Sequence, residues 1–380
     1  MMPQPDVDKG KKCVLVVGQT PPPYHGQAIM IRALLDGSYV GVRLVHQPMN
    51  FSHTMSDIGV FNWRKVAALF ALILGIIYRR FKEGATALYY PPAGPNGIPI
   101  ARDVVVLLAT RWLFRTTILH FHAGGLGAFI GSLNPGVRRL CLAAYGKADI
   151  GIRMSDAAPD DPMALKARRS EIVPYGIADS FPHYDQVRSR RPRLAKTILF
   201  AGALRESKGI LVLLDAFSIL KAEKVRCHLV LMGEWESSAF ERTCRDAMER
   251  LDISPDVSCV GLLSGDAKFE WFAKASVLCL PSHYSSEAFP VSIIEAMQFA
   301  LPVVATRWRG IPDLVRDGVT GTLVEPRDPR GVATALANIL SDEAVAAGMG
   351  AAARREFQAA YTIDAFHRRM DRVMTRVTSA

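Results

Sequence analysis

Alternating strand-like and helix-like segments restrict the fold of this chain more than any other feature of its sequence. The first series begins with the apolar run CVLVVG, a loop rich in Gly and Pro, and the helical pattern AIMIRALL. It continues with ALYYPP, TILHFHAGG and ADIGIRMS, which have the length and composition of strands. Repetition of strand, loop and helix predicts a parallel sheet covered on both faces, with ligands bound at the carboxyl ends of its strands.

A second series of the same kind starts at TILFAGAL (197–204), after a polar, Arg-rich stretch at 185–196 that interrupts the pattern. A chain of 380 residues is long enough for two such domains. We therefore predict an α/β protein with two Rossmann-like, doubly wound parallel-sheet domains that face each other across a cleft. Their predicted extents are 1–185 and 186–360.

The end of the chain, 361–380, has the pattern of an amphipathic helix. Ile363, Phe366, Met370 and Met374 recur on one helical stripe. We predict that this helix docks back against one of the two domains.

The composition bears on partners and on location. A formal net charge of +10 favours an anionic partner, although charge alone does not choose among nucleotides, phospholipid surfaces and nucleic acids. The basic residues are dispersed and no recognition motif accompanies them, so nucleic-acid binding is not expected. The six cysteines lack metal-ligand spacing, and the apolar run at 14–17 is too short for a signal peptide. These features predict a cytoplasmic protein without a metal site.

The segment from Val66 to Tyr78 holds thirteen apolar residues between basic flanks. A helix of that length covers about 20 Å, less than the roughly 30 Å of a bilayer core, so a transmembrane span is not favoured. It is either a buried core helix or an interfacial one. Between residues 61 and 115 there are eight Lys or Arg residues against two acids, Glu83 and Asp103. Our hypothesis is therefore peripheral contact with the anionic inner face of the plasma membrane.

Two Rossmann-like domains raise the question of a dinucleotide-dependent oxidoreductase. The loop after the first strand, 18–26, contains three prolines and no G-x-G-x-x-G sequence. The other glycine cluster has Gly125 and Gly127 but places Ile130 where the third glycine belongs. The sequence therefore does not support dinucleotide chemistry.

The stretch HYSSEAFPVSIIEAM carries two carboxylates, Glu287 and Glu295, around the start of a predicted helix. Pro290 suits the first turn of that helix. The unpaired backbone N–H groups and the positive dipole end at such a helix start favour a phosphate group. The plainer interpretations are that Glu287 caps the helix and that Glu295 is a surface charge on it.

A cationic loop, ALRESKG, follows the first strand of the second series and contains Arg205 and Lys208. Two cations in a strand-to-helix loop can hold a diphosphate and can stabilise the negative charge that develops on a phosphate leaving group. Two solvated loop charges are the simpler alternative.

The ordered set FAGALRESKGI, VLMGE, CVGLLSGD, ASVLCLPSHYSSEAFPVSIIEAM, ALPVVAT and GIPDLVRDGVTGTLVEP resembles the family 4 retaining glycosyltransferases of the two-domain GT-B fold. The likeness covers nearly the whole chain and is strongest from about residue 195 to 340. It implies an enzyme that transfers a sugar from a nucleotide-diphosphate sugar without a metal ion or other cofactor.

The resemblance also implies residue roles in the second domain. Glu287 would contact the donor sugar, with the backbone of Ala288, Phe289 and Pro290 at the sugar and diphosphate. Glu295 would bind the ribose, and Arg205 and Lys208 would hold the diphosphate. Lys208, Glu287 and a histidine of the first domain form the predicted catalytic set.

That histidine is His122 in HFHAGG, with His120 as the less favoured candidate, and Gly26 would let the backbone approach the diphosphate. Two departures from the family pattern are visible. The family commonly has an arginine at the position of Ala203, so Arg205 stands two residues late. Ala300 replaces a usual glycine at the end of the helix that carries Glu295.

The predicted acceptor is a saccharide, preferably one linked to polyprenyl diphosphate, in the synthesis of envelope or extracellular polysaccharide. Two alternatives remain open. A protein of the same fold could bind nucleotide sugars without transferring them, and an epimerase or a phosphorylase could use the same fold.

Overall fold

The computed structural model describes residues 10–22, 26–49, 51, 63–184 and 196–378. The chain divides into two compact units, unit 1 with residues 1–176 and 363–380, and unit 2 with residues 177–362. The division after 176 precedes the predicted boundary at 185, and the predicted linker at 185–195 lies outside the described residues. The cleft between the two domains stays a prediction.

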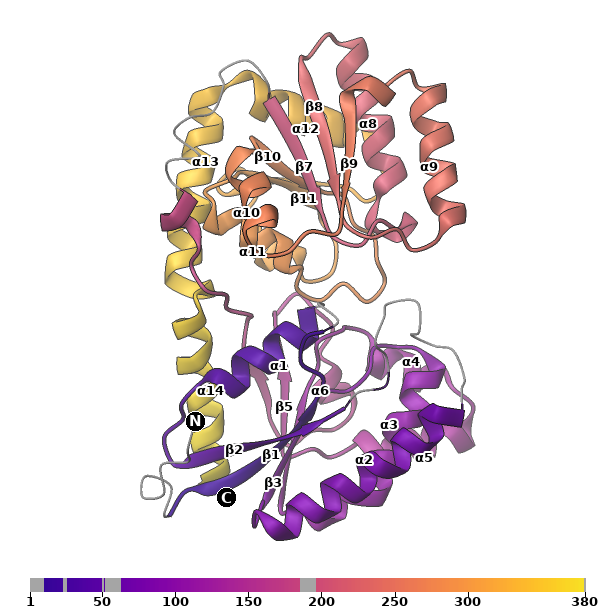
Figure 1. Cartoon of the computed structure of the whole chain (residues 1–380), viewed down its shortest axis with the longest axis vertical. Coiled ribbons are helices and arrows are strands. Elements are labelled where there is room, and N and C mark those ends of the chain that lie inside the picture. The colour runs from indigo at the N-terminus through magenta and orange to yellow at the C-terminus, as the bar shows by residue number, and fades with distance from the viewer. Residues whose placement is uncertain (1–9, 23–25, 50, 52–62, 185–195, 379–380) are drawn as a thin grey trace. The chain divides into compact units, whose positions relative to one another are not determined.

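Unit 1 is built on a six-stranded sheet in which every strand pairing is parallel (Figure 1). Its strands are β1 (Lys12–Gly18), β2 (Val42–Pro48), β3 (Ala87–Tyr90), β4 (Thr116–His120), β5 (Ile150–Arg153) and β6 (Ser170–Ile172). They lie in the order β2-β1-β3-β4-β5-β6. The chain reverses its direction of growth between β1 and β3, where loops diverge and ligands of such sheets usually bind.

Helices follow almost every strand of this sheet. They are α1 (Gly26–Asp36), α2 (Trp63–Lys82), α3 (Gly97–Thr110) with the 3₁₀ turn η2 (Arg111–Leu113), α4 (Leu126–Ser132), α5 (Pro135–Tyr145) and α6 (Asp161–Ala164). Buried side chains of α2, α3 and α5 share one apolar core with side chains of β1, β3 and β4, so these helices cover the same face of the sheet. The predicted α/β class with parallel sheets is confirmed.

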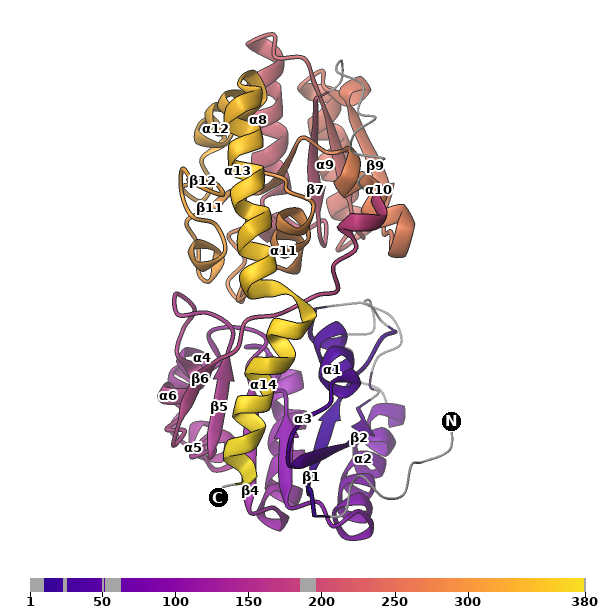
Figure 2. The same ribbon diagram turned by 90° about the vertical axis from the view of Figure 1, so that its left-hand side faces the viewer.

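The last helix, α14 (Ile363–Thr378), is part of unit 1 although it ends the chain. It buries Phe366, Met370 and Met374 completely, three of the four residues of the apolar stripe. His367 is within hydrogen-bond distance of the Ala33 carbonyl of α1, at 2.8 Å. Figure 2 shows α14 lying beside α1 on the sheet.

Unit 2 repeats the design with a second all-parallel sheet. Its strands are β7 (Lys196–Ala201), β8 (Cys227–Met232), β9 (Val257–Gly261), β10 (Val277–Leu280), β11 (Val303–Thr306) and β12 (Gly321–Val324). The order β12-β11-β10-β7-β8-β9 is that of a dinucleotide-binding Rossmann sheet, and its reversal lies between β7 and β10.

The helices of unit 2 pack on both faces of this sheet (Figure 2). They are α8 (Ile210–Ala222), α9 (Ser238–Arg250), α10 (Gly265–Lys274), α11 (Val291–Gln298), α12 (Pro329–Ser341) and α13 (Glu343–Glu356). Short 3₁₀ turns are η3 (Glu206–Lys208), η4 (Ser254–Asp256) and η5 (Ile311–Asp313), and the π-helical segment η6 (Phe357–Tyr361) follows α13.

The sequence did not predict the strands β2 and β6, nor the helices α4, α5, α6, α10, α12 and α13. The side chains of β2 are mostly half-buried, because it is an edge strand, and β6 has only three residues, so neither makes a buried apolar run. The start of α12 is nevertheless marked, because the Asp328 carboxylate accepts the Gly331 N–H at 2.9 Å and Pro329 occupies the first turn.

Helix α2 extends beyond the thirteen-residue apolar segment and buries Leu72 and Ile76 against the sheet. Among the described residues, no helix combines the length and the hydropathy that crossing a bilayer requires. One side of this helix therefore belongs to the unit 1 core, and its other side is exposed.

Ala300 ends helix α11 in the left-handed conformation, with φ +50°. The Leu301 N–H donates to the Ala296 carbonyl and the Ala300 N–H to the Met297 carbonyl, which is the Schellman termination that glycine normally provides. The left-handed conformation costs an alanine about 1–2 kcal/mol. Glycine avoids this cost, but part of the gain is lost because a glycine has more conformational entropy in the unfolded chain. We expect Ala300→Gly to raise the free energy of unfolding in urea by about 0.5–1 kcal/mol. An unchanged or lower stability would contradict this account of the departure.

Candidate functional site

The candidate site of unit 2 lies where its sheet reverses. The loops that follow β7 and β10 leave neighbouring strands at their carboxyl ends, and Arg205 and Lys208 stand on the first loop and Glu287 on the second. The His283 N–H donates to the Ser207 carbonyl at 2.8 Å, which joins the two loops directly. The reversal point of an open α/β sheet is its usual ligand site.

Gly209 allows the two loops to approach. Its φ is +80°, and a Cβ placed there would lie 2.1 Å from the carbonyl oxygen of Pro281. Any side chain at this position would therefore push the loop after β7 away from the loop after β10. The glycine that follows Lys208 in the sequence is thus required by the closeness of two backbones.

Lys208 and Glu287 form the centre of the site. The Lys208 Nζ lies 2.5 Å from Glu287 Oε2, and the Ser282 hydroxyl donates to the same oxygen at 2.7 Å. The side chains of Lys208 and Glu287 are only 16% and 6% exposed. Within the described part of the chain, Glu287 Oε1 accepts no hydrogen bond, so one carboxylate oxygen remains for a hydroxyl of a ligand.

Arg205 reaches the same place from its later position in the sequence. Its guanidinium lies over the Tyr284 ring at 5.2 Å, and the Lys208 ammonium lies over that ring at 5.4 Å. Leu204 pairs with residues 234 and 236 by two backbone hydrogen bonds, which fixes where Arg205 leaves the loop. The Arg205 Nε is 3.6 Å from Glu236 Oε2. Both cations therefore gather on one aromatic ring.

The loop after β10 is held from its other side by the loop after β11. The Thr306 hydroxyl donates to the Ser282 carbonyl, and the Trp308 indole N–H donates to the Tyr284 carbonyl at 2.8 Å. These bonds orient Ser282 and Tyr284 toward the two cations without using their side chains. The ring and the carboxylate are thus rigidly positioned.

Glu295 lies inside α11, and its carboxylate is buried. The Lys268 ammonium of α10 is 2.5 Å from Glu295 Oε1. Glu295 is therefore neither a cap nor a solvated surface charge. In the part of the chain that the structure describes, Glu295 Oε2 accepts no hydrogen bond, so it can still accept one from a ligand.

Residues 288–290 connect Glu287 to α11. Ala288, Phe289 and Pro290 are buried, and the contact of their backbone with a ligand stays a prediction. No side chain caps α11, because Pro290 at its start provides none and the Glu287 carboxylate is held by Lys208 and Ser282. The plainer interpretation of Glu287 as a helix cap is therefore wrong.

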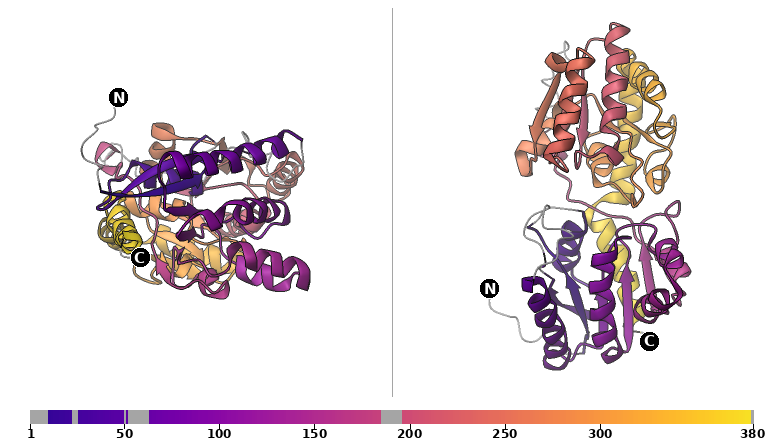
Figure 3. Two further views of the ribbon diagram at one scale, coloured as in Figure 1. Left: turned by 90° about the horizontal axis from the view of Figure 1, so that it is seen from below. Right: turned by 90° about the vertical axis from the view of Figure 1, so that its right-hand side faces the viewer.

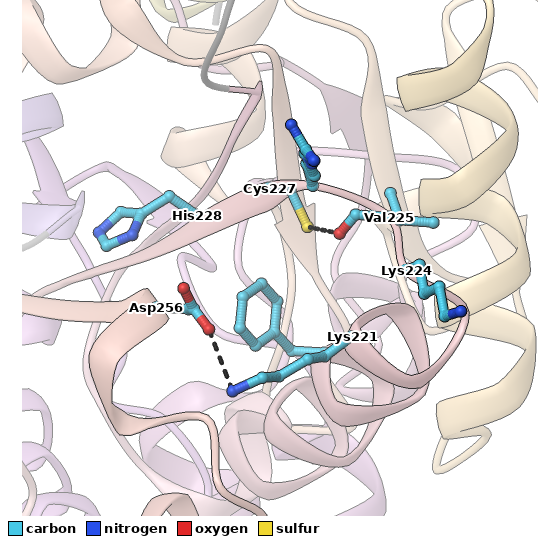
Figure 4. Close-up of a pocket in the computed structure, with 8 residues that line it drawn as sticks. Lys221, Lys224, Val225, Cys227, His228 and Asp256 are labelled. Atoms are coloured by element: carbon cyan, nitrogen blue, oxygen red, sulfur yellow. Dashed lines mark hydrogen bonds and ion pairs between the residues drawn. The ribbon is translucent and has the colours of Figure 1, made fainter.

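A pocket of about 550 Å³ lies elsewhere in unit 2, at the amino ends of the strands (Figure 4). It is lined by Phe217, Lys221, Lys224, Val225, Arg226, Cys227, His228 and Asp256. Lys221 is 3.2 Å from the Asp256 carboxylate and 3.6 Å from that of Asp252, so its charge is compensated. None of the predicted site residues lines this pocket.

The histidines of unit 1 follow β4 and stack on each other. The rings of His120 and His122 have centroids 4.1 Å apart at 30°. His122 Nδ1 lies 2.7 Å from the Tyr175 hydroxyl, and His120 Nδ1 lies 2.5 Å from the Tyr89 hydroxyl. His122 is partly exposed whereas His120 is completely buried, so only His122 can meet a ligand.

The stability of the protein should depend on pH through His120. Burial lowers the pKa of its imidazole to about 3 from 6.5, so the unfolded chain binds this proton first as pH falls. Stability is complete above pH 6.5 and is lost toward pH 3, by up to about 1.4 kcal/mol per pH unit. We expect His120→Gln to flatten the pH dependence of the free energy of unfolding in urea over this window. His183→Gln, at an exposed histidine, is the control, and equal slopes for both variants would contradict the prediction.

The glycine-rich segment after His122 is closed by an acid of unit 1. The Asp161 carboxylate accepts the N–H groups of Gly125 and Gly127 at 2.8 and 2.7 Å, where α4 begins. This helix start is therefore occupied by a carboxylate of the chain itself. Gly26 is the first residue of α1, next to residues 23–25, which lie outside the described part, and its role at the diphosphate stays a prediction.

The structure thus brings Arg205, Lys208 and Glu287 together, and it gives Glu295 a separate partner. The sequence reading did not identify Ser282, Tyr284 and Lys268, which complete these contacts. Tyr284 lies in the stretch HYSSEAFPVSIIEAM and Ser282 directly precedes it, so their nearness to Glu287 was visible in the sequence. Lys268 precedes Glu295 by 27 residues, and only the packing of α10 and α11 brings them together.

Part of unit 2 is similar to a known enzyme family. Residues 195–342 match the family described as glycosyl transferases group 1, and this range includes Arg205, Lys208, Glu287 and Glu295. The resemblance to glycosyltransferases is therefore confirmed at the level of this domain.

Curated relatives agree with this result. The chain is 28% identical over 200 residues to O-antigen chain mannosyltransferase C of Escherichia coli, covering 52% of each chain. It is 31% identical over 225 residues to D-inositol 3-phosphate glycosyltransferase of Corynebacterium urealyticum, covering 55% of this chain and 53% of that one. The matched region thus spans about half the length of the curated relatives.

Solved structures share the whole fold. A sucrose-phosphate synthase from Thermosynechococcus elongatus superposes with a TM-score of 0.76 over 97% of this chain and 100% of its own, at 18% identity. HepE from Anabaena, solved with UDP and glucose, superposes with a TM-score of 0.70 over 95% of this chain and 99% of its own, at 14% identity. The predicted GT-B fold is confirmed.

Proposed function

We propose that this protein is a retaining glycosyltransferase that moves a sugar from a nucleotide-diphosphate sugar to a saccharide acceptor, preferably one linked to a lipid. One observation carries the proposal. Arg205 and Lys208 gather on the Tyr284 ring beside the buried Glu287, at the reversal point of a Rossmann sheet. Cations and a carboxylate in that arrangement suit a diphosphate next to a sugar.

The proposed donor lies along unit 2. Its diphosphate contacts Lys208, Arg205 and the uncapped N-terminus of α11, while Glu287 Oε1 accepts a sugar hydroxyl and Glu295 Oε2 accepts a ribose hydroxyl. The Lys208–Glu287 pair orients both groups before the donor binds, because each supplies the counterion of the other. Lys268 does the same for Glu295.

The proposed reaction exchanges one bond for another on the same face of the sugar. The bond between the anomeric carbon and the diphosphate oxygen breaks as the acceptor oxygen bonds to that carbon, and the diphosphate takes the acceptor proton. Lys208 and Arg205 then stabilise the charge of the departing diphosphate. No nucleophilic carboxylate and no metal are needed in this scheme, in which His122 lies near the reacting carbon.

A two-stage experiment tests the function. A thermal-shift screen of nucleotide sugars identifies the donor, because a ligand that binds only the folded state raises the melting temperature. The donor is then incubated with saccharide acceptors with and without a polyprenyl-diphosphate anchor, and the anomeric configuration of the product is read by NMR. An inverted product overturns the retaining mechanism, and binding without release of nucleotide diphosphate indicates a binding protein instead. An epimerised sugar on intact nucleotide indicates an epimerase.

A further inference from the structure

Helix α3 and the turn η2 expose an uninterrupted apolar stripe. Ile98, Ala101, Val105, Leu108 and Trp112 follow each other at helical spacing of three and four residues. Four of them are large, and their exposed fractions are 55%, 47%, 41% and 74% in chain order. The opposite stripe of the same helix is buried in the unit 1 core. The helix is thus apolar on both sides, which packing against the sheet does not explain.

Helix α2 has the same property. Phe70, Leu74, Tyr78 and Phe81 lie on one stripe and are each more than 60% exposed. The side of α2 that faces the sheet carries Leu72 instead. Helix α2 packs against α3, and α3 against α5, so the three helices lie side by side on one side of unit 1 (Figures 1 and 3). We use the name apolar helix face for the exposed apolar side chains of α2, α3, η2 and α5 taken together.

No free acid belongs to this face. Between Trp63 and Lys147 the sequence has only two acidic residues, Glu83 and Asp103. Glu83 pairs with Arg43 at 3.1 Å. Asp103 is completely buried and accepts hydrogen bonds from Arg102, Tyr90, Tyr145 and the Ala93 N–H.

Exposed cations lie at the ends of the same helices. Lys82 is the last residue of α2, Arg115 and Lys147 lie just beyond the ends of η2 and α5, and Arg138 and Arg139 are in the first half of α5. Because the helices run parallel between parallel strands, Lys82, Arg115 and Lys147 gather at one edge of the unit, together with Tyr78, Phe81 and Trp112. Aromatic rings and cations at the border of an apolar surface are typical of the lipid–water interface.

We propose that the apolar helix face docks on the surface of an anionic phospholipid bilayer, with the apolar stripes of α2 and α3 in the acyl–headgroup boundary and the cations on the headgroups. A second copy of this chain fits less well, because it would bring the same uncompensated positive charge against this face. The proposal adds a membrane surface to the lipid-linked acceptor of the proposed function. It rests on that function only for the reason why the protein would bind a membrane.

Vesicle co-sedimentation of the full chain tests the proposal. The protein is mixed with phosphatidylcholine vesicles that contain or lack phosphatidylglycerol, at low and at high salt. We expect binding to the anionic vesicles that weakens as salt rises, since headgroup attraction is screened. A protein that stays in the supernatant with both vesicles at low salt overturns the proposal. Transfer is not measured, so failure here is separate from failure of the proposed function.

Two sets of variants locate the surface. Leu74→Ser with Trp112→Ser removes apolar contacts from solvent-exposed positions, and Lys82→Glu with Arg115→Glu reverses the charge at the edge. We expect each pair to weaken binding by about tenfold or more. The matched controls lie in unit 2: Leu262→Ser, at a leucine 62% exposed, and Lys224→Glu with Arg226→Glu, beside the basic pocket of Figure 4. Controls should bind as the unchanged protein does.

The remaining outcomes also decide the question. Equal loss in the unit 2 controls, or no loss in the unit 1 variants, would show that another surface binds the vesicles. Concentration-dependent dimers in sedimentation velocity that disappear in Leu74→Ser with Trp112→Ser would make the face a contact between copies, against the proposal. Unchanged melting temperatures of the variants establish that lost binding does not come from unfolding.

Discussion

Replacing Lys208 with methionine should lower kcat/KM for the proposed sugar transfer by about 10²–10³-fold, because the departing diphosphate of that scheme would lose a cation. The same change should destabilise the protein by about 3 kcal/mol, since Glu287 then keeps a buried charge without a counterion. Both effects are measured on one sample, transfer with the donor found by thermal shift and stability by urea unfolding. The size of the second effect follows from the 6% exposure of the Glu287 side chain.

A double variant separates the two effects. Lys208→Met with Glu287→Gln removes both charges. The amide oxygen at position 287 can still accept the hydrogen bond from the Ser282 hydroxyl. We expect most of the lost stability to return while transfer stays low. Recovery of transfer in the double variant would show that Lys208 only neutralises Glu287 and does not serve the diphosphate. Lys221→Met is the control, because Lys221 also forms ion pairs in unit 2 but lies away from the site.

Replacing Glu295 with glutamine should raise KM for the donor by about 10–100-fold with a small change in kcat. The reason is that a hydrogen bond to a charged group contributes about 1.5–3 kcal/mol, and the proposed bond from the ribose to Glu295 would be made equally before and during the reaction. The preference for a ribose donor over its 2′-deoxy and 3′-deoxy analogues should be reduced in the variant. The measurement is steady-state kinetics with the ribose donor and the two analogues.

The control and the contrary result are equally defined. Glu249→Gln, at an exposed position of α9, should leave KM unchanged. A Glu295→Gln enzyme that keeps both its KM and its preference for ribose would place the nucleotide elsewhere. Because Lys268 loses its partner in Glu295→Gln, unfolding in urea is followed in parallel, and a folded variant with a raised KM separates binding from stability.

The sequence predicted most of the fold because parallel strands covered on both faces are apolar along their length. Runs such as CVLVVG, TILFAGAL and SVLCLPS are stable only as buried strands. In the structure they form the buried strands β1, β7 and β10. The edge strand β2 escaped detection because its side chains are half-buried and the pattern is correspondingly polar. The order of the strands in each sheet could not be predicted either, because the strands have similar apolar sequences.

The site shows the same division. Lys208, Glu287 and Glu295 were found from sequence because they stand at fixed positions beside strand ends and a helix start. The pairings were not predicted, because Glu287 binds Lys208 across 79 residues and Glu295 binds Lys268, which was not predicted, across 27. Arg205 illustrates the limit most clearly. Its late position in the sequence left its role open, and the backbone pairing of Leu204 with the loop after β8 brings it onto Tyr284 beside Lys208.

The sequence by itself determined the α/β class, two sheets, and which residues carry charge at the strand ends, because hydrophobic periodicity and residue type are local properties. Only the tertiary structure decided that Glu287 and Lys208 neutralise each other, that Glu295 has its own lysine, and that the outer sides of α2 and α3 form one continuous apolar surface. These facts depend on which elements pack side by side. Packing brings together residues that are distant along the chain, and no local pattern records that choice.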